Sequence, residues 1–218
     1  MELTIGEIKK LFSKNTLVLA DDEKLKGVCK DTRTLKSGEL YVAIQGENFD
    51  GHAFVEKAID LGACAAVVSD ASFKGDNLIY VDDTVNALGE LAAYYRKKFS
   101  QPIIAITGSN GKTTTKELLT HVLKGSGEVL STKGNLNNHI GVPLTISSFT
   151  HSAKFLVVEL GMSHAGEIDY LTRLLQPDLA LITNVGRAHL EGLHGDLEKV
   201  ALAKGELFAA LSASETAF

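Results

Sequence analysis

Hydrophobic and polar positions alternate in a regular rhythm in the second half of the chain. Short apolar runs at residues 103–107, 155–160 and 179–183 are typical of buried strands, because each is too short for a helix and apolar almost throughout. Segments with helical spacing separate these runs, and another short strand is predicted at 128–131. The helices are predicted at 112–124, 166–175 and 197–211. This alternation predicts a parallel sheet covered by helices.

The first hundred residues also mix strands and helices, but their elements are shorter. Thr4 and Glu7 form a capping-box pattern in front of apolar residues at helical spacing, which predicts a first helix. Later elements are predicted as strands at 40–44, 65–68 and 78–81, and as helices at 54–61 and around Val85, Leu88, Leu91 and Tyr95. Pro102 biases the residue before it away from helix, so we place a domain boundary near residue 100. The expected α/β domains span residues 1–100 and 101–218.

Composition and charge narrow the class of protein. The chain has 218 residues, 44% of them hydrophobic, and only 3 prolines, which predicts a folded core. Its net charge of −5 leaves no basic surplus, so we expect no nucleic-acid partner. No apolar run approaches the roughly 18 residues of a spanning helix, and the N-terminus is acidic where a signal peptide is cationic. Cys29 and Cys64 are too few for a disulfide framework and lack metal-ligand spacing. We expect a cytoplasmic monomer with no membrane partner.

The clearest motif is a glycine-rich loop that joins the strand at 103–107 to the helix at 112–124. Its nucleotide-binding candidates are Gly108, Ser109, Asn110, Gly111, Lys112, Thr113 and Thr114. Glycines let backbone N–H groups face an anion, and the helix N-terminus adds a favourable dipole. Lys112 would reach the β- and γ-phosphates, and the Thr113 hydroxyl would ligate Mg²⁺.

This loop is a variant of the usual phosphate-binding pattern, because Ile106 stands where that pattern has its first glycine. The alternative interpretation is a glycine turn beside an exposed lysine. The guanine-reading pattern Asn-Lys-x-Asp does not occur in the sequence, which favours ATP as the nucleotide.

Two further candidates follow other strands of the predicted sheet. Glu159 stands at the end of the apolar run at 155–160, where a carboxylate can hold the magnesium of a bound nucleotide. A helix cap or a solvent-facing acid is the alternative. His189 follows the strand at 179–183, at the edge where parallel sheets bind ligands, although a lone histidine is more often structural. Both residues are candidate metal ligands.

Two other features carry no assignment from the residues alone. Lys204 lies among apolar positions of the last predicted helix, where a lysine usually extends its stem and reaches water with its ammonium. The stretch 134–143 holds three asparagines and two glycines. They could offer amide groups to a polar ligand or form ordinary turns.

Taken together, these segments resemble the Mur ligases, the ATP-dependent amide-forming enzymes of peptidoglycan synthesis. The order and spacing of the resembling segments are more specific than any single one of them. They are Asp31-Thr32-Arg33, Val42 to His52, Thr107 to Thr114, Gly134 to Pro143, Glu159 to Met162, Gly166-Glu167-Ile168, Thr183-Asn184, Ala188 to Gly192 and Ala203 to Glu206.

Within the family, the chain resembles the member that adds a dipeptide. Ligases that add the third peptide residue typically have Ser-Ser-His and Asp-His-Leu-Asp where this chain has Met162-Ser163-His164 and Ala188-His189-Leu190-Glu191. Folylpolyglutamate synthases share the central domain but lack this kind of N-terminal uridine-nucleotide domain. The resemblance implies UDP-N-acetylmuramoyl-tripeptide and D-alanyl-D-alanine as partners, with ATP and two Mg²⁺ ions as cofactors.

The resemblance also implies a small UDP-binding α/β domain followed by a P-loop type parallel-sheet ATPase domain, and it suggests roles for individual residues. Lys112, His189 and Lys204 would be catalytic, Lys204 as a carbamate, because carbamylation supplies the oxygen donors that Mg²⁺ prefers. Metal would be held by Thr113, Glu159 and His189, and Asn184 would join the loop in binding the nucleotide. The substrate-binding positions would be Thr32, Arg33, Gly46, His52, Asn137 and Asn138.

The reaction implied by the resemblance activates a peptide carboxylate with ATP and passes the acyl phosphate to an amine. The family continues beyond a length of 218 residues into a third, Rossmann-like domain, so we expect this chain to be an N-terminal part that is inactive alone. Two alternatives stay open. One is a related Mur ligase that adds a single amino acid, and the other is a non-catalytic nucleotide-binding module.

Overall fold

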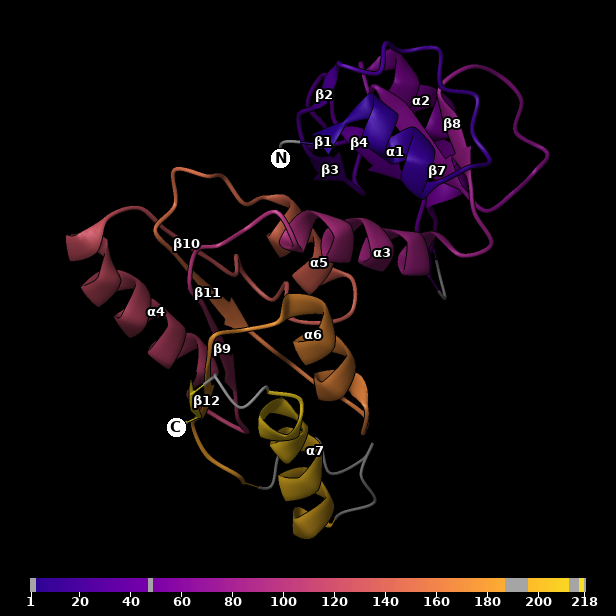
Figure 1. Ribbon diagram of the computed structural model, residues 1–218. Helices are drawn as coiled ribbons and strands as arrows, with labels where there is room; N and C mark the ends of the chain where they lie inside the picture. Colours follow the sequence, from indigo (N-terminus) through magenta and orange to yellow (C-terminus); the bar gives the residue numbers. More distant parts are fainter. Residues whose placement is uncertain (1–2, 47–48, 187–195, 212–215, 218) are drawn as a thin grey trace. The chain divides into compact units, whose positions relative to one another are not determined.

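The structure is a computed structural model that describes residues 3–46, 49–186, 196–211 and 216–217 (Figure 1). The chain divides into two compact units, an N-terminal unit of Met1–Tyr95 and a C-terminal unit of Arg96–Phe218. The division falls inside a helix, shortly before the boundary predicted near residue 100. Within the described ranges, no helix has both the length and the apolar character needed to cross a membrane.

The N-terminal unit is built on a parallel sheet of four strands in the order β3–β4–β7–β8, with two short antiparallel pairs, β1–β2 and β5–β6. The strands are β1 (Leu3–Thr4), β2 (Lys24–Leu25), β3 (Val28–Cys29), β4 (Leu40–Val42), β5 (Gln45–Gly46), β6 (Phe49–Asp50), β7 (Ala65–Val68) and β8 (Leu78–Tyr80). The helices are α1 (Ile5–Leu11), the 3₁₀ turn η1 (Gly51–Phe54), α2 (Val55–Asp60) and α3 (Thr84–Arg96).

Local sequence accounts for the start of α1, and apolar packing accounts for α2. The Thr4 side chain accepts the backbone N–H of Glu7, whose carboxylate accepts the N–H of Thr4, so the predicted capping box is formed. Val55 and Ala58 of α2 pack into a buried cluster with Tyr41 and Val68 of the sheet. This cluster therefore lies between the sheet and α2, and further buried residues of α1 and α3, among them Ile8 and Leu91, add to the core of the unit.

The C-terminal unit has a sheet of five parallel strands in the order β10–β11–β9–β12–β13. The strands are β9 (Ile103–Thr107), β10 (Val129–Ser131), β11 (Phe155–Glu159), β12 (Leu179–Ile182) and β13 (Thr216–Ala217). The helices are α4 (Lys112–Leu123), the 3₁₀ turn η2 (Lys124–Ser126), α5 (Gly141–Ser147), α6 (Glu167–Leu175) and α7 (Leu197–Ala209). In Figure 1, α4 covers one side of the strands and α6 lies on the other.

Alternating side chains of the central strands explain the two-sided cover. Ile104, Ile106 and Val157 form one buried cluster, and Leu119 and Leu123 of α4 pack against it. Successive strand residues point to opposite faces, so the residues between them serve the other face. The α/β class with parallel sheets, predicted from the alternation of elements, is confirmed.

One helix forms where the sequence favoured turns or an amide-rich loop. The Asn138 side chain accepts the N–H groups of Ile140 and Gly141 in the turn that leads into α5. Pro143 is tolerated because it lies in the first turn of the helix. Gly141 is required there, since a Cβ would come within 2.3 Å of the backbone of Leu136. The strands of two residues in the N-terminal unit were also missed, because they are too short to show a period.

Candidate functional site

Three adjacent strands of the C-terminal unit deliver their loops to one edge of the sheet. In the sheet register, Glu159 of β11 is paired with Ile106, and Ile182 of β12 is paired with Thr107. Because β9 lies between β11 and β12, the segments that follow these three strands meet. We call the loop 108–114 together with Asn137 and Glu159 the phosphate-loop site.

Glycines shape the loop after β9. Gly108 has a φ of +148°, and a Cβ there would come within 1.9 Å of the Thr183 hydroxyl oxygen. Gly111 is left-handed with a φ of +78° and precedes α4 directly. No side chain caps this end of the 12-residue helix, so its first N–H groups are available to an anion. The loop therefore has the backbone of an anion-binding turn.

The two signature side chains of the loop bond to the protein itself. Lys112 folds back over the loop and donates its ammonium to the carbonyl of Gly108 at 2.7 Å. The Thr113 hydroxyl donates to Oε2 of Glu159 at 2.9 Å. A phosphate group entering the loop would replace the carbonyl as the partner of Lys112, because charge-assisted bonds are the stronger ones.

Glu159 is buried and is held from two sides. Its side chain belongs to a residue only 4% exposed, and Asn137 donates its amide to Oε1 at 3.0 Å. Asn137 in turn accepts the N–H of Gly161 on its carbonyl at 2.7 Å. A Cβ at Gly161 would lie 2.8 Å from the Asn137 amide, so glycine permits this approach. The site thus combines a carboxylate, an amide and a hydroxyl around one point.

This donor set fits magnesium. Hydroxyl and carboxylate oxygens are hard donors, and Mg²⁺ commonly keeps several waters and takes one or two protein carboxylates along with phosphate oxygens. Among the described residues, no group of three or more His, Cys, Asp or Glu side chains gathers as a metal site. Thr113 and Glu159 can hold such an ion. His189 lies outside the described residues.

The far side of the loop is fixed by the segment after β12. Asn184 accepts the N–H of Asn110 at 3.1 Å and donates its amide to the carbonyl of the same residue at 3.1 Å. The Ser109 hydroxyl donates to the carbonyl of Gly186 at 3.0 Å. These bonds join the loop to the segment after β12, so Asn184 positions the loop.

Lys204 lies on α7 and is only 1% exposed. Burial, helped by the positive charge of Lys112, lowers the pKa of its amine to about 8. Two residues further on, the Glu206 carboxylate accepts the N–H groups of Gly166 and Asp169 and thereby fixes α7 to the start of α6. A buried amine with a pKa of about 8 differs chemically from a surface lysine, because part of it is uncharged at physiological pH. The sequence alone did not show this burial.

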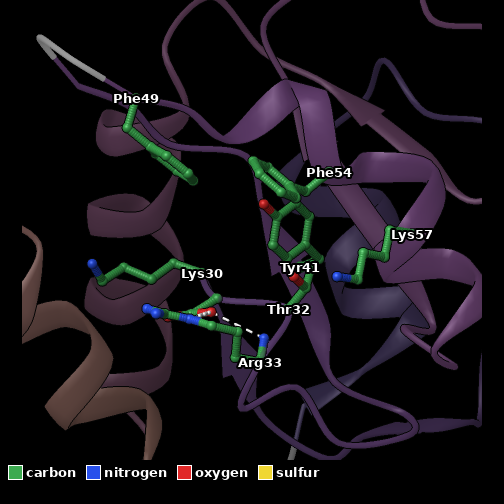
Figure 2. A pocket seen from close by; sticks show the side chains of 8 residues that line it. Lys30, Thr32, Arg33, Tyr41, Phe49, Phe54 and Lys57 are labelled. Carbon is green, nitrogen blue, oxygen red and sulfur yellow. Dashed lines mark hydrogen bonds and ion pairs between the residues drawn. The ribbon is translucent and has the colours of Figure 1, made fainter.

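The N-terminal unit holds a separate hollow, which we call the N-terminal cavity (Figure 2). Its volume is about 500 Å³. The rings of Phe49 and Phe54 stack with centroids 5.4 Å apart. The lining residues are Lys30, Asp31, Thr32, Arg33, Tyr41, Phe49, Phe54 and Lys57. Aromatic walls with several cations suit a flat ring that carries phosphate groups.

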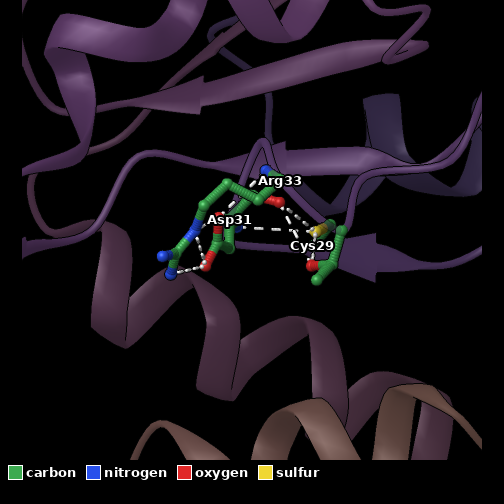
Figure 3. Close-up of polar contacts among 4 residues, drawn as sticks. Cys29, Asp31 and Arg33 are labelled. Carbon is green, nitrogen blue, oxygen red and sulfur yellow. Dashed lines mark hydrogen bonds and ion pairs between the residues drawn. The ribbon is translucent and has the colours of Figure 1, made fainter.

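One edge of the cavity is a tight polar turn (Figure 3). The Arg33 guanidinium donates to both oxygens of Asp31, with Nε at 2.9 and 3.1 Å. This hydrogen bonding lowers the pKa of the Asp31 carboxyl to about 2. The thiol of Cys29 donates to the Asp31 carbonyl at 3.2 Å. The pair therefore stays ionised at neutral pH, with the Arg33 side chain 84% exposed.

His52 and Gly46 lie elsewhere in the unit. His52 is buried, with Nδ1 2.7 Å from Asp50 and Nε2 accepting the Ser69 N–H at 2.9 Å. The Ser69 hydroxyl is 3.2 Å from the same nitrogen. A carboxylate, an imidazole and a serine hydroxyl in this sequence also form the catalytic triad of serine hydrolases. Here the backbone N–H occupies Nε2, so the imidazole joins two chain segments. Gly46 lies exposed on β5.

Family models match both units. A model described as the Mur ligase middle domain matches residues 106–218, and one described as the Mur ligase family catalytic domain matches residues 24–96. The chain belongs to the Mur ligase family. The resemblance inferred from the sequence segments is therefore confirmed.

Similar Mur ligases include curated relatives and solved structures. The UDP-N-acetylmuramoyl-tripeptide–D-alanyl-D-alanine ligase of Bacillus subtilis (strain 168) is 46% identical over 185 residues, 83% of this chain and 40% of the relative. A MurF structure from Acinetobacter baumannii has a TM-score of 0.90 at 34% identity and covers 100% of this chain and 48% of that one. A Thermotoga maritima MurF ligase in complex with ADP has a TM-score of 0.81 at 34% identity, covering 88% and 45%. The chain thus spans less than half the length of these relatives.

The structure brings together only part of the residues that the sequence singled out. The loop 108–114 lies beside Glu159 and Asn137, and Thr32 and Arg33 line the cavity. The Asn138 side chain accepts the N–H groups of Ile140 and Gly141 at the start of α5. Sequence reasoning missed the aromatic walls of the cavity, although three aromatic residues within 41–54 were a signal for a ring-binding pocket. The ligands of all these residues stay predictions.

Proposed function

We propose that this Mur ligase chain carries the sugar-nucleotide and ATP-binding parts of an enzyme that joins UDP-N-acetylmuramoyl-tripeptide to D-alanyl-D-alanine in peptidoglycan precursor synthesis. The observation that carries the proposal is the glycine-shaped loop whose Thr113 meets the buried Glu159 at 2.9 Å. The relatives named for this reaction, 46% identical in Bacillus subtilis, support the choice of substrates.

ATP would occupy the phosphate-loop site. Its phosphates would take the N–H groups at the start of α4, and Lys112 would exchange the Gly108 carbonyl for a phosphate oxygen. Magnesium, when bound, would neutralise charge on the phosphates, with Thr113 and Glu159 as its protein ligands and His189 as a further predicted ligand. Two ions are proposed by resemblance to the family. The use of ATP favours the cytoplasm as the compartment.

The proposed chemistry has two balanced steps. A carboxylate oxygen of the peptide attacks the γ-phosphorus, and ADP leaves with the electrons of the broken P–O bond, which gives an acyl phosphate. The amine of D-alanyl-D-alanine then attacks the acyl carbon. The tetrahedral intermediate expels phosphate and the nitrogen loses a proton. Lys112 would stabilise the charge that develops on the transferred phosphoryl group, and Asn137 and Asn138 would orient the acyl arm.

The N-terminal cavity would take the UDP end of the sugar nucleotide. The Phe49 and Phe54 rings offer apolar faces to a base, and Arg33 and Lys57 offer positive charge to phosphates. Thr32 lines the same hollow. Gly46 and His52 would act indirectly, because His52 ties the segment after β6 to Ser69.

Lys204 would act as a carbamate. Carbamylation requires a neutral amine, and a pKa of about 8 leaves an appreciable neutral fraction at physiological pH. The modified side chain would present oxygen atoms in place of a cation, which suits a site that holds magnesium.

The test separates three outcomes. Calorimetry of the 218-residue chain with UDP-N-acetylmuramoyl-tripeptide and with Mg–ATP should show binding of both. Phosphate release is then assayed in a protein extended to the length of the relatives, with D-alanyl-D-alanine and with single amino acids. Release with the dipeptide alone supports the proposal, and release with a single amino acid assigns a sister activity. Binding of the nucleotides without turnover in the extended protein overturns the proposal and assigns a nucleotide-binding module.

A further inference from the structure

Lys116 is an unusual lysine because it is buried. It lies on α4, one turn after Thr113, and is only 2% exposed. Burying a cation is costly unless it is paired and hydrogen-bonded. A lysine kept in such a place therefore needs partners, and its partners indicate what it holds.

The ammonium of Lys116 has two partners. It donates to the backbone carbonyl of Thr132 at 2.9 Å and lies 3.1 Å from the carboxylate of Glu117. Glu117 is the exposed neighbour on the same helix, so it balances the charge without joining α4 to another element. The bond to Thr132 is the one that connects α4 to the segment after β10.

Thr132 passes this constraint on to β11. The residue is 2% exposed, and its hydroxyl accepts the backbone N–H of Glu159 at 2.9 Å. Its own N–H donates to the carbonyl of Val157 at 3.1 Å. Thr132 therefore fixes the end of β11 at the residue that carries the candidate magnesium ligand.

We propose that Lys116 is a positioning residue for the magnesium–ATP site. Helix α4 then holds Glu159 twice, directly through the Thr113 hydroxyl and indirectly through Lys116 and Thr132. The two connections set both the carboxylate and the backbone beneath it. This inference rests on the proposed function, since it assumes that Glu159 takes metal there.

The first experiment measures how ATP binding to the 218-residue chain depends on magnesium concentration. Lys116→Met keeps the apolar stem and removes the cation, and it should raise the magnesium concentration for half-maximal ATP binding about tenfold. Binding of ATP without magnesium should stay within about twofold, because the loop is intact. Lys124→Met, at an exposed lysine just beyond α4, is the matched control and should behave like the parent.

A second pair of variants tests the next link and guards against a misfolded Lys116→Met protein. Thr132→Val removes the acceptor for the Glu159 N–H and should raise the magnesium concentration for half-maximal ATP binding. Thr132→Ser keeps a hydroxyl and should need the same magnesium concentration as the parent. Unchanged magnesium dependence in a folded Lys116→Met protein overturns the inference. If Lys116→Met does not fold, a Thr132→Val protein with the magnesium dependence of the parent is enough to overturn the inference.

Amide hydrogen exchange separates this inference from the proposed function. The Glu159 amide should exchange about tenfold faster in Lys116→Met, while amides in the middle of β9 keep their parental rates. A parent chain that shows no magnesium-dependent ATP binding refutes the proposed function. The exchange rate of Glu159 then still decides whether Lys116 positions this strand end, and equal rates in parent and variant refute it.

Discussion

The N-terminal cavity is a hollow of about 500 Å³ walled by aromatic rings, whereas the phosphate-loop site is filled by hydrogen bonds among its own polar groups. A ligand of the cavity gains mainly by covering Phe49 and Phe54. A ligand of the loop must replace the bonds that Lys112 makes to Gly108 and that Thr113 makes to Glu159. The two units therefore differ in how they would bind a ligand. The N-terminal cavity offers an open apolar space, whereas in the phosphate-loop site the ligand replaces hydrogen bonds between protein groups.

This difference also decides at which residues a substitution should have a large effect. In the loop, Lys112 and Thr113 each bond one defined partner, and a Cβ at Gly108 would meet Thr183. The loss of one charge or the addition of one Cβ should therefore change the site. In the cavity, contact area is spread over several side chains, so the loss of one should be smaller. The predictions below test that contrast in order of expected effect.

Removing the loop cation should have the largest effect. Lys112→Ala should weaken Mg–ATP binding about 100-fold, because the γ-phosphate loses its only charged partner within the loop. Calorimetry measures this, and binding of a uridine nucleotide by the same variant should be unchanged. Lys124→Ala serves as the control for the loss of a charge. An affinity for Mg–ATP equal to that of the parent would contradict the proposal that the loop binds ATP.

Adding one methyl group to the loop should act on stability. Gly108→Ala forces an alanine into a φ of +148° and towards the Thr183 hydroxyl, so the free energy of unfolding should fall by about 2 kcal/mol. Urea denaturation followed by circular dichroism measures the change. Gly125→Ala is the matched control, since an added Cβ there meets nothing within 4 Å. Equal losses at both glycines would contradict the close approach in the loop.

Removing one wall of the cavity should be milder. Phe54→Ala should weaken binding of a uridine nucleotide about tenfold, in line with the loss of one stacking surface. Phe54→Tyr keeps the ring and should bind as the parent does. Leu61→Ala, at an exposed apolar residue of the same unit that does not line the cavity, is the control. An unchanged affinity in Phe54→Ala would show that the base binds elsewhere.

The smallest expected change concerns Lys204 and pH. Its pKa of about 8 means that the neutral amine, the form that takes up CO₂, increases about fivefold between pH 7 and pH 8. At a fixed concentration of dissolved ¹³CO₂, the carbamate signal should therefore rise over this interval. Lys204 loses its proton at a lower pH in the folded chain than in the unfolded chain. The free energy of unfolding should therefore also rise with pH between about 8 and 10.5. Lys204→Met should abolish both trends, and a carbamate signal that persists in this variant would assign it to another lysine.

Prediction from sequence succeeded where the causes are local. The capping box at Thr4 and Glu7, the loop from Gly108 to Thr114 and the apolar strand ending at Glu159 depend on neighbouring residues, and all appear where expected. It failed for α5, because an Asn-rich stretch with glycine and proline has the composition of a turn, although a helix begins at Gly141. The bond between Asn137 and Glu159 joins positions 22 residues apart, so no local pattern reveals it.

The sequence by itself determined the alternation of strands and helices, the glycine-rich loop and the membership of the Mur ligase family, because these are written in periodicity, residue type and spacing. The tertiary structure alone decided that Lys116 and Lys204 are buried, that His52 is tied to Asp50 and Ser69, and that aromatic rings from separate segments enclose a cavity. Burial and partnership are properties of what folds against a residue. They are set by contacts between distant parts of the chain, which residue order does not display.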